Sequence, residues 1–331
     1  MKKAHNTDID QNHTNVPSQA FHNEDERSTK SASSLSKLLF LAPLLSGILW
    51  GTSGTFVRTI AAMGLGTVEI LLTRVSFATV VMLIITFVYD KKLLRIKLKD
   101  IWIFIIAGLV STLGLNICYN ITMQIMTLSF AAVLLSMAPV FVLILARIFF
   151  REKITSKKIV CMILALTGCA LVSGAFDSIS TAALSVGGIL IGFLSAFFYA
   201  LYSIFSRLAF ERGYHTLTIL AYCFTMITIA LIPFADWSLI ADAFHAGPGR
   251  FTVITIFHSL CVSILPYLLF TAAIRRMDTG IASILASSEP VAAMVFGLIF
   301  FDETPTFFSV IGMILTLIAL GILSMSETKK S

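Results

Sequence analysis

The sequence predicts an all-α integral membrane protein with ten transmembrane helices, arranged as two inverted five-helix repeats. Three observations lead to this fold class: the apolar composition, an internal repeat, and the confinement of basic residues to alternate loops. Of the 331 residues, 57% are apolar and only 13% are charged, and the mean hydropathy is +0.92. A soluble domain carries about 25% charged residues, so the composition indicates a chain that lies mostly in lipid.

The internal repeat is clearest where residues 126–155 align with residues 277–306. At this shift of 151 positions, eleven of the thirty aligned residues are identical, which favours an ancestral duplication over the chance similarity of apolar runs. Further upstream, at a shift of 149, Arg58 aligns with Arg207. Self-similarity over most of the chain predicts two copies of one helical unit.

In chain order, a polar tail precedes ten apolar spans. Residues 1–36 contain few apolar side chains, and we expect them to form a disordered cytoplasmic tail. The first repeat is expected over residues 37–178 and the second over residues 182–326, with five spans in each. Apolar runs of about 18 residues or more are typical of membrane-spanning helices. The expected spans are 38–58, 68–89, 101–121, 126–147, 158–175, 184–206, 215–235, 251–271, 278–301 and 307–325.

The basic residues predict the orientation of these spans. Lys and Arg gather in the loops that follow even-numbered spans, and the other loops are nearly free of them. Cytoplasmic loops carry such an excess of Lys and Arg, so both termini are predicted to be cytoplasmic. Because five is an odd number, the second repeat must cross the membrane in the opposite direction to the first. Inverted repeats are typical of alternating-access transporters, whose sites lie near the midplane between the repeats.

Several short motifs accompany the repeat. They are the Trp50-Gly51 pair in the first span, Arg74 early in the second, Pro139 in the fourth with Glu152 at its end, and Glu289-Pro290-Val291 in the ninth with Glu303 at its end. Over about residues 37–326, these features together resemble the EamA domains of the drug/metabolite transporter superfamily. The resemblance implies a ten-helix carrier of the bacterial cytoplasmic (inner) membrane, usually an exporter of amino acids, related metabolites or drugs.

Glu289 is the first candidate for a transport site. It lies near the middle of the ninth span, where an ionised carboxylate costs about 2.5–3.5 kcal/mol on insertion scales. A group this costly usually faces a cavity or a partner, so Glu289 is predicted to bind a substrate ammonium or to take up and release a proton. The first repeat has Ala138 at the matching position, so the helix scaffold does not require an acid. The alternative is a structural carboxylate that Arg74 or the hydroxyls of Ser287 and Ser288 neutralise.

Two prolines and an arginine are further candidates. Pro139 and Pro290 occupy matching positions in the fourth and ninth spans, and each removes a helical hydrogen bond and can kink its helix. These kinks either border the solute pathway or are static features of the helices. Arg74 lies one to two turns inside the second span, where it either contacts the substrate, braces the bundle or extends towards the outer surface.

The remaining candidates are aromatic or polar residues in the middle of spans. They are Trp50, Tyr199, Tyr202, Asn116, Tyr267 and His258. Trp50 aligns with Tyr199 in the repeat, and Asn116 aligns with Tyr267. We expect such pairs either to line a solute cavity or to pack in the core. His258 can titrate near neutral pH, although a lone histidine within a helix more often bonds to a neighbouring hydroxyl or carbonyl.

The predicted function is secondary transport of a small organic solute by alternating access, with export as the expected direction and protons as the candidate coupling ion. The alternatives are an uncoupled facilitator and a transport-inactive membrane sensor or interaction protein. The sequence has no nucleotide-binding loop, metal-ligand motif or catalytic triad, which argues against an enzyme, a cofactor or a metal. The scattered basic residues do not favour nucleic acid. The expected partners are the solute and the lipid bilayer, with the protein a monomer or a homodimer.

Overall fold

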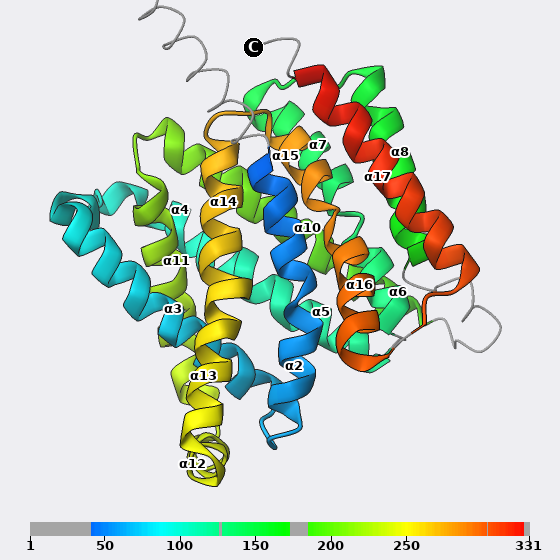
Figure 1. Cartoon of the computed structure of the whole chain (residues 1–331). Helices are drawn as coiled ribbons and strands as arrows, with labels where there is room; N and C mark the ends of the chain where they lie inside the picture. Colours follow the sequence, from blue (N-terminus) through cyan, green and yellow to red (C-terminus); the bar gives the residue numbers. More distant parts are fainter. Residues whose placement is uncertain (1–40, 126–127, 173–184, 303, 328–331) are drawn as a thin grey trace, which may run out of the picture.

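The protein is a bundle of helices. A computed structural model describes residues 41–125, 128–172, 185–302 and 304–327, and within these ranges it contains helices but no strand (Figure 1). The predicted tail at residues 1–36 lies outside the described residues. The helices are residues 41–51, α2 (Ser53–Ala61), α3 (Thr67–Asp90), α4 (Ile101–Ile105), the π-helix η3 (Ile106–Leu113), α5 (Gly114–Ile125), α6 (Leu128–Leu135), α7 (Ala138–Phe150), α8 (Ser156–Val172), α10 (Val186–Glu211), α11 (Thr216–Leu231), α12 (Trp237–Ala246), α13 (Pro248–His258), the π-helix η5 (Ser259–Ile264), α14 (Leu265–Ile274), α15 (Thr279–Ala286), α16 (Glu289–Phe301) and α17 (Phe307–Glu327), with short 3-10 turns at η1 (Lys91–Leu94), η2 (Leu98–Asp100) and η4 (Ile232–Phe234).

Seven helical segments are long and apolar enough to cross a membrane. They are Thr67–Leu94, Leu98–Thr122, Ala131–Phe150, Val186–Glu211, Thr216–Phe234, Pro248–Ile274 and Thr279–Phe301. Each coincides with one predicted span, so the all-helical, multi-pass membrane class is confirmed for the described part of the chain. The other three predicted spans, 38–58, 158–175 and 307–325, fall on helices that do not meet this criterion of length and composition in the described residues. Ten membrane crossings therefore remain a prediction.

The two repeats share backbone irregularities as well as sequence. Among the described residues, positive φ angles occur at Gly64 and Gly213 (89° and 85°) and at Arg151 and Asp302 (56° and 53°). The members of each pair are related by the repeat shifts of 149 and 151 positions. Arg151 and Asp302 follow the last residues of α7 and α16 in the left-handed conformation, which is uncommon for residues other than glycine. Figure 1 shows these two helix ends at opposite ends of the bundle, the arrangement expected of inverted repeats.

Both repeats also interrupt one helix near its middle. The break between α6 and α7 falls at residues 136–137, and the break between α15 and α16 falls at residues 287–288. Pro139 and Pro290 lie in the first turn of the half-helix that follows. A first-turn N–H has no acceptor within its helix, so a proline is tolerated there. Each proline thus lies just after a two-residue turn in its helix, at the position where the sequence predicted a kink.

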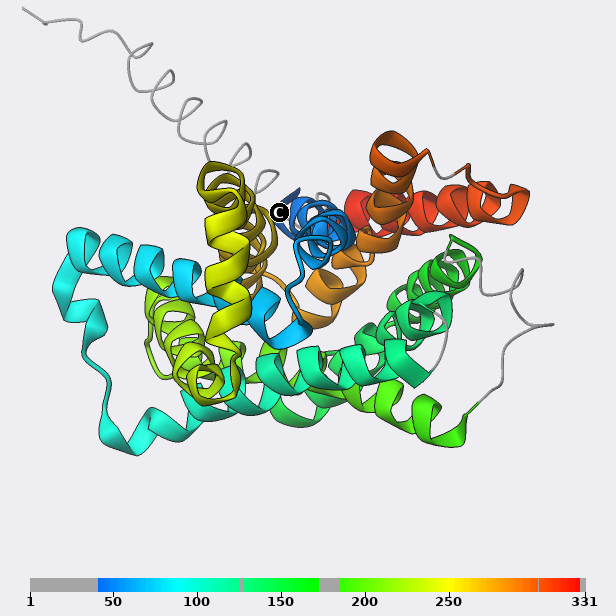
Figure 2. The ribbon, with the colours of Figure 1, turned by 90° about the horizontal axis from the view of Figure 1, so that it is seen from below.

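The loops divide between two ends of the bundle. The end that holds loops 91–100, 151–155, 212–215 and 275–278 is rich in Lys and Arg, and we call it the basic end. We call the other end, with loops 61–66, 235–247 and 302–306, the open end. In Figure 1 the basic end is uppermost. Figure 2, which looks at the open end, shows α2 between α13 and α16, so the first span lies beside the helices of the second repeat.

One segment between the predicted spans 215–235 and 251–271 forms a helix at the open end. Residues 235–247 contain α12, which begins where the side chain of Asp236 accepts a hydrogen bond from the Ser238 N–H at 2.9 Å. The carboxylate of Glu69 accepts the Asp236 N–H at 2.8 Å and so ties α12 to α3. Ala243 of α12 is buried in a small cluster with Ile60. A ten-residue helix carries too little apolar periodicity to stand out beside long membrane spans.

A seam of glycines joins the two repeats. α8 of the first repeat packs along α17 of the second, and Gly168 and Gly312 face each other across the contact. A Cβ atom at Gly312 would lie 2.5 Å from the carbonyl oxygen of Gly168, and one at Gly168 would lie 2.2 Å from Oγ1 of Thr316. Small residues permit this close approach of membrane helices. The seam therefore depends on having no side chain at either glycine.

Candidate functional site

A large cavity enters the bundle from the open end. Its volume is about 660 Å³, within the usual range of small-molecule sites. Its walls come mainly from the first span, α3, α5, α16 and the segment before α17, with single residues from α6, α8 and α17. Glu289, at one wall, lies 12 residues before the end of α16, which is about 18 Å along a helix. The cavity thus reaches from the open end to the middle of the bundle. Its polar lining residues are Trp50, Ser53, Thr55, Arg58, Thr67, Arg74, Asn116, Tyr119, Asn120, Glu289, Thr304, Thr306 and Ser309.

Glu289 presents its carboxylate to this cavity. It is the first residue of α16, directly after the helix break, where the free N–H groups of a helix favour negative charge. Its carboxylate makes no hydrogen bond and no ion pair with the described residues. The neutralising contacts that the sequence suggested are absent there, because Arg74 bonds to Asn116 and the Ser288 hydroxyl bonds to the Leu44 carbonyl at 2.9 Å.

Arg74 lies in the same cavity and is held by an amide. Its Nη2 donates to Oδ1 of Asn116 at 3.3 Å, and Nδ2 of Asn116 donates to the Thr112 carbonyl at 2.7 Å. The second bond fixes the orientation of the amide, so that its oxygen faces the guanidinium. The Nε atom of Arg74 is buried and has no hydrogen-bond partner in the described part of the chain. Arg74 therefore does not extend to the surface, and it retains donors for an anionic group.

Four of the predicted aromatic residues form one cluster beside the cavity. The Trp50 ring lies 6.0 Å from Tyr199 and 5.3 Å from Tyr267, and Tyr202 lies 5.2 Å from Tyr267, as ring centroids. Trp50 donates from Nε1 to the carbonyl of Val262 at 3.2 Å. Only Trp50 of the four lines the large cavity. Tyr199 and Tyr267 pack against Trp50, and Tyr202 packs against Tyr267. Trp50 therefore forms part of the cavity wall, and the other three rings are part of the packing around it.

A smaller pocket lies next to Glu289. Its volume is about 110 Å³, and it shares Tyr119, Glu289 and Pro290 with the large cavity. Pro139 and Tyr199 also line it. The two predicted prolines thus border the same space, one from each repeat. This places both helix breaks at the inner end of the cavity.

His258 lies apart from the site. Its side chain is fully buried, stacks on Phe56 at 5.5 Å between ring centroids, and lines neither pocket. Neither ring nitrogen has a hydrogen-bond partner among the described residues, contrary to the usual expectation for a buried histidine. Tyr119 and Asn120 are among the lining residues that were not predicted from the sequence. They lie three and four residues after Asn116, which puts all three on one helix face, and this spacing was the available signal.

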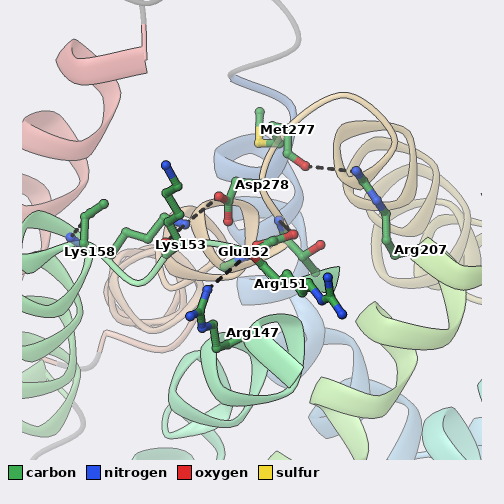
Figure 3. A network of polar contacts seen from close by, with 11 residues as sticks. Arg147, Arg151, Glu152, Lys153, Lys158, Arg207, Met277 and Asp278 are labelled. Atoms are coloured by element: carbon green, nitrogen blue, oxygen red, sulfur yellow. Dashed lines mark hydrogen bonds and ion pairs between the residues drawn. The ribbon is translucent and has the colours of Figure 1, made fainter. Parts of the chain in front are cut away.

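The basic end is closed by polar contacts between the repeats (Figure 3). Glu152, just after α7, accepts the N–H of Thr279 at 3.0 Å and that of Gly280 at 3.4 Å, at the start of α15. Lys158 of α8 pairs with Asp278 at 2.5 Å. Arg207 of α10 donates to backbone carbonyls of the α14–α15 connection. None of these side chains lines the cavity.

A second cluster closes the same end nearby. Asp100 accepts from Arg212 at 2.9 Å and from the Tyr214 hydroxyl at 2.8 Å, and Tyr214 in turn accepts the N–H of Lys97 at 3.0 Å. These contacts hold the loop before α4 against the loop after α10.

The chemistry of the site is that of binding. The cavity offers a carboxylate, two guanidinium groups, two side-chain amides and aromatic faces, which suit a small charged organic molecule. In the described residues, no group of three His, Cys, Asp or Glu side chains could hold a metal ion.

Comparison with known proteins agrees with this description. The sequence profile of the EamA-like transporter family matches residues 36–174 and 186–325, one copy in each repeat. An uncharacterized transporter of Archaeoglobus fulgidus is 25% identical over 284 residues, which cover 84% of this chain and 95% of that protein. An uncharacterized transporter of Bacillus subtilis, YxxF, is 30% identical over 182 residues, but the match spans only about half of each chain, 54% and 56%.

Two further similarities extend over most of the chain. The pseudopaline exporter CntI of Pseudomonas aeruginosa is 24% identical over 294 residues, covering 87% of this chain and 98% of that protein. A protein crystal structure superposes with a TM-score of 0.66 over 87% of this chain and 96% of that one, at 17% identity. The last similarity supports the fold alone.

Proposed function

Because the chain belongs to the EamA-like transporter family, we propose that it is a secondary carrier that moves a small organic solute by alternating access. It is a multi-pass membrane transporter rather than an enzyme. The proposal adds ten spans in two inverted repeats, location in a bacterial inner membrane, and cytoplasmic termini. In this orientation the basic end faces the cytoplasm, as the excess of Lys and Arg favours, and the open end faces outward.

The main support for the proposal is that the bundle is open at one end and closed at the other. The cavity opens at one end and stops at Glu289 and the helix breaks, while contacts between the repeats close the other end. A carrier of this kind exposes its site to one side at a time by moving one repeat against the other. We therefore assign the structure to the outward-open state of the cycle.

The charges in the cavity favour a solute that carries both signs. Glu289 offers an unpaired carboxylate to an ammonium group, and Arg74 offers planar donors to a carboxylate. Trp50 supplies an aromatic face for the apolar or cationic part of the molecule. Amino acids and related zwitterionic metabolites fit this set. Cationic drugs are the alternative class, and they would use Glu289 without Arg74.

Export and proton coupling are the remaining parts of the proposal. One relative is named as an exporter, which supports export here by similarity. Glu289 is the proposed proton carrier because its carboxylate is half-buried, lies at the inner end of the cavity and has no cationic partner among the described residues. A proton and a cationic solute would then compete for one carboxylate, which is a simple basis for exchange.

The test is solute flux in proteoliposomes with an imposed pH gradient. Radiolabelled amino acids and a fluorescent cationic dye would be compared in the wild type and in Glu289→Gln, with Glu69→Gln as the matched control because Glu69 lies outside the cavity. We expect flux that follows the gradient in the wild type and in the control, and flux without this dependence in Glu289→Gln.

Two other outcomes would favour the alternative functions. Flux that is independent of the gradient and equal in all three proteins would indicate an uncoupled facilitator. The absence of flux for every solute, with the proteins correctly folded, would favour a transport-inactive sensor or interaction protein.

A further inference from the structure

The closed basic end contains two carboxyl groups from different repeats that meet each other. We propose that Glu152 and Asp278 share one proton while the cytoplasmic gate is closed and release it when the gate opens, which makes the gate a pH-sensitive switch. The gate is defined here as Glu152, Lys158 and Asp278 together with the N-terminus of α15. The inference rests on the alternating-access proposal, because it concerns the transition to the inward-open state.

Glu152 is placed in the gate by the end of α7. Arg151 adopts the left-handed conformation that ends the helix, and the next side chain, Glu152, reaches across to the second repeat. Its Oε1 accepts the Thr279 N–H at 3.0 Å, whereas its Oε2 lies 3.4 Å from the Gly280 nitrogen. One carboxyl oxygen is therefore firmly held, and the other is held weakly enough to carry a proton.

Asp278 has a vacant acceptor that this proton would fill. Its Oδ2 accepts Nζ of Lys158 at 2.5 Å, but its Oδ1 is buried and has no hydrogen-bond partner among the described residues. The Glu152 carboxyl is within hydrogen-bond reach of Asp278. A buried acceptor without a donor is costly, and a protonated Glu152 would supply the donor. Figure 3 shows these side chains side by side.

The cationic side chains around Glu152 and Asp278 do not neutralise both carboxyl groups. Lys158 forms one ion pair, with Asp278, and its Nζ also donates to the carbonyl of Lys153 at 2.8 Å. Arg147 of α7 donates to the Arg151 carbonyl. Arg207 of α10 donates to the carbonyls of Ile274 and Met277. In the described part of the network, two carboxyl groups therefore share one ammonium partner.

The electrostatics assign the proton to Glu152. Burial and the adjacent Asp278 carboxyl raise the pKa of Glu152 from 4.5 to about 7. The hydrogen bonds from Glu152 and Lys158 and the charge of Lys158 outweigh burial at Asp278, so the pKa of Asp278 is lowered. When the gate opens, Glu152 enters water, where its pKa returns towards 4.5. The closed gate therefore binds the proton more tightly than the open gate does.

The sign of the pH dependence follows from this difference. Because acid favours the state that binds the proton more tightly, lowering the pH closes the gate. From pH 4.5 to about 7, opening releases one proton, and the ratio of open to closed gates rises tenfold per pH unit, about 300-fold in total. Above about pH 7 Glu152 is ionised in both states, and the ratio becomes constant. An acidified cytoplasm would thus stop the carrier in its outward-open state.

Glu152→Gln imitates the protonated gate. The amide oxygen can accept the Thr279 N–H, and the amide nitrogen can donate to the free Oδ1 of Asp278. Asp278→Asn instead removes the like charge and should move the transition to lower pH. Asp100→Asn is the matched control, since Asp100 closes the same end without a second carboxyl.

The experiment is a distance measurement by electron paramagnetic resonance in lipid nanodiscs from about pH 4.5 to pH 8.5. Nitroxide labels would be placed at Lys157 and Arg276, two exposed positions on either side of the gate, in a variant without the native cysteines. We expect the long-distance population of the wild type to rise with pH and level off near pH 7. Glu152→Gln should keep the short distance at every pH, and Asp100→Asn should retain the pH dependence.

Two results would overturn the inference, and they are distinguishable. If both distances are populated but their ratio does not depend on pH, or depends on it equally in Glu152→Gln, the switch is refuted and alternating access stands. If one distance is found for every variant at every pH, alternating access itself fails and the switch fails with it.

Discussion

A methyl group at position 51 should force the first span away from α16. A Cβ atom added to Gly51 would lie 2.6 Å from the Ala292 Cβ, 2.8 Å from the Ala293 nitrogen and 2.9 Å from the Glu289 carbonyl oxygen. Favourable carbon–carbon contact begins at about 3.5 Å, so the helices must separate by roughly 1 Å. Two of the three obstructing atoms belong to the backbone and cannot rotate away.

The free energy of this change can be estimated from two opposing effects. Overpacking in a well-packed interior costs about 1–3 kcal/mol, and the backbone contacts favour the upper part of that range. Replacing glycine by alanine within a helix stabilises the helix by about 1 kcal/mol. We therefore expect Gly51→Ala to lower the free energy of unfolding by roughly 1–2 kcal/mol.

Gly54→Ala is the matched control for this measurement. Gly54 lies three residues further along the same span, and a Cβ there would meet no atom within 4 Å, so only the helix-propensity gain applies. Both variants would be compared with the wild type by thermal unfolding in detergent, followed by intrinsic fluorescence. Equal stability of the two variants would refute the close approach of the first span to α16.

Two other substitutions test separate parts of the structure. Trp50→Phe removes the hydrogen bond to the Val262 carbonyl but keeps an aromatic ring, so it should cost about 1 kcal/mol of stability; an unchanged unfolding temperature would contradict that bond. His258→Phe removes two unpartnered ring nitrogens from a buried position outside the cavity, so stability should be kept or increased and the proteoliposome flux should not change. Loss of flux at normal stability would place His258 in the transport pathway.

The repeat was the part of the structure that sequence predicted best. The alignment of residues 126–155 with residues 277–306 anticipated two halves with matching helices, and the structure adds matching left-handed residues at Arg151 and Asp302. The helix breaks were also indicated by the sequence, because Pro139 and Pro290 follow them at matching positions of the two repeats. Duplicated sequence preserves local backbone geometry, so these features could be found without knowledge of the tertiary contacts.

The candidate site was predicted only in part, for a physical reason. In a membrane protein the lipid-facing and core-facing sides of a helix are both apolar, so composition does not show which side faces a cavity. Glu289 stood out because a charge in the membrane is costly. Tyr119 and Tyr267 look alike in sequence, yet only Tyr119 lines the cavity. The contact of Glu152 with Thr279 joins residues 127 positions apart, and no local pattern could indicate it.

The glycine seam between α8 and α17 has a consequence for biosynthesis. Gly168 is made 144 residues before Gly312, the residue whose backbone it contacts. At about 5–20 residues per second of synthesis, α8 waits roughly 7–30 seconds in the membrane for its partner. During that time the small-residue face of α8 is in contact with lipid or with another helix. The packing of α8 is thus completed only when α17, made much later in synthesis, enters the membrane.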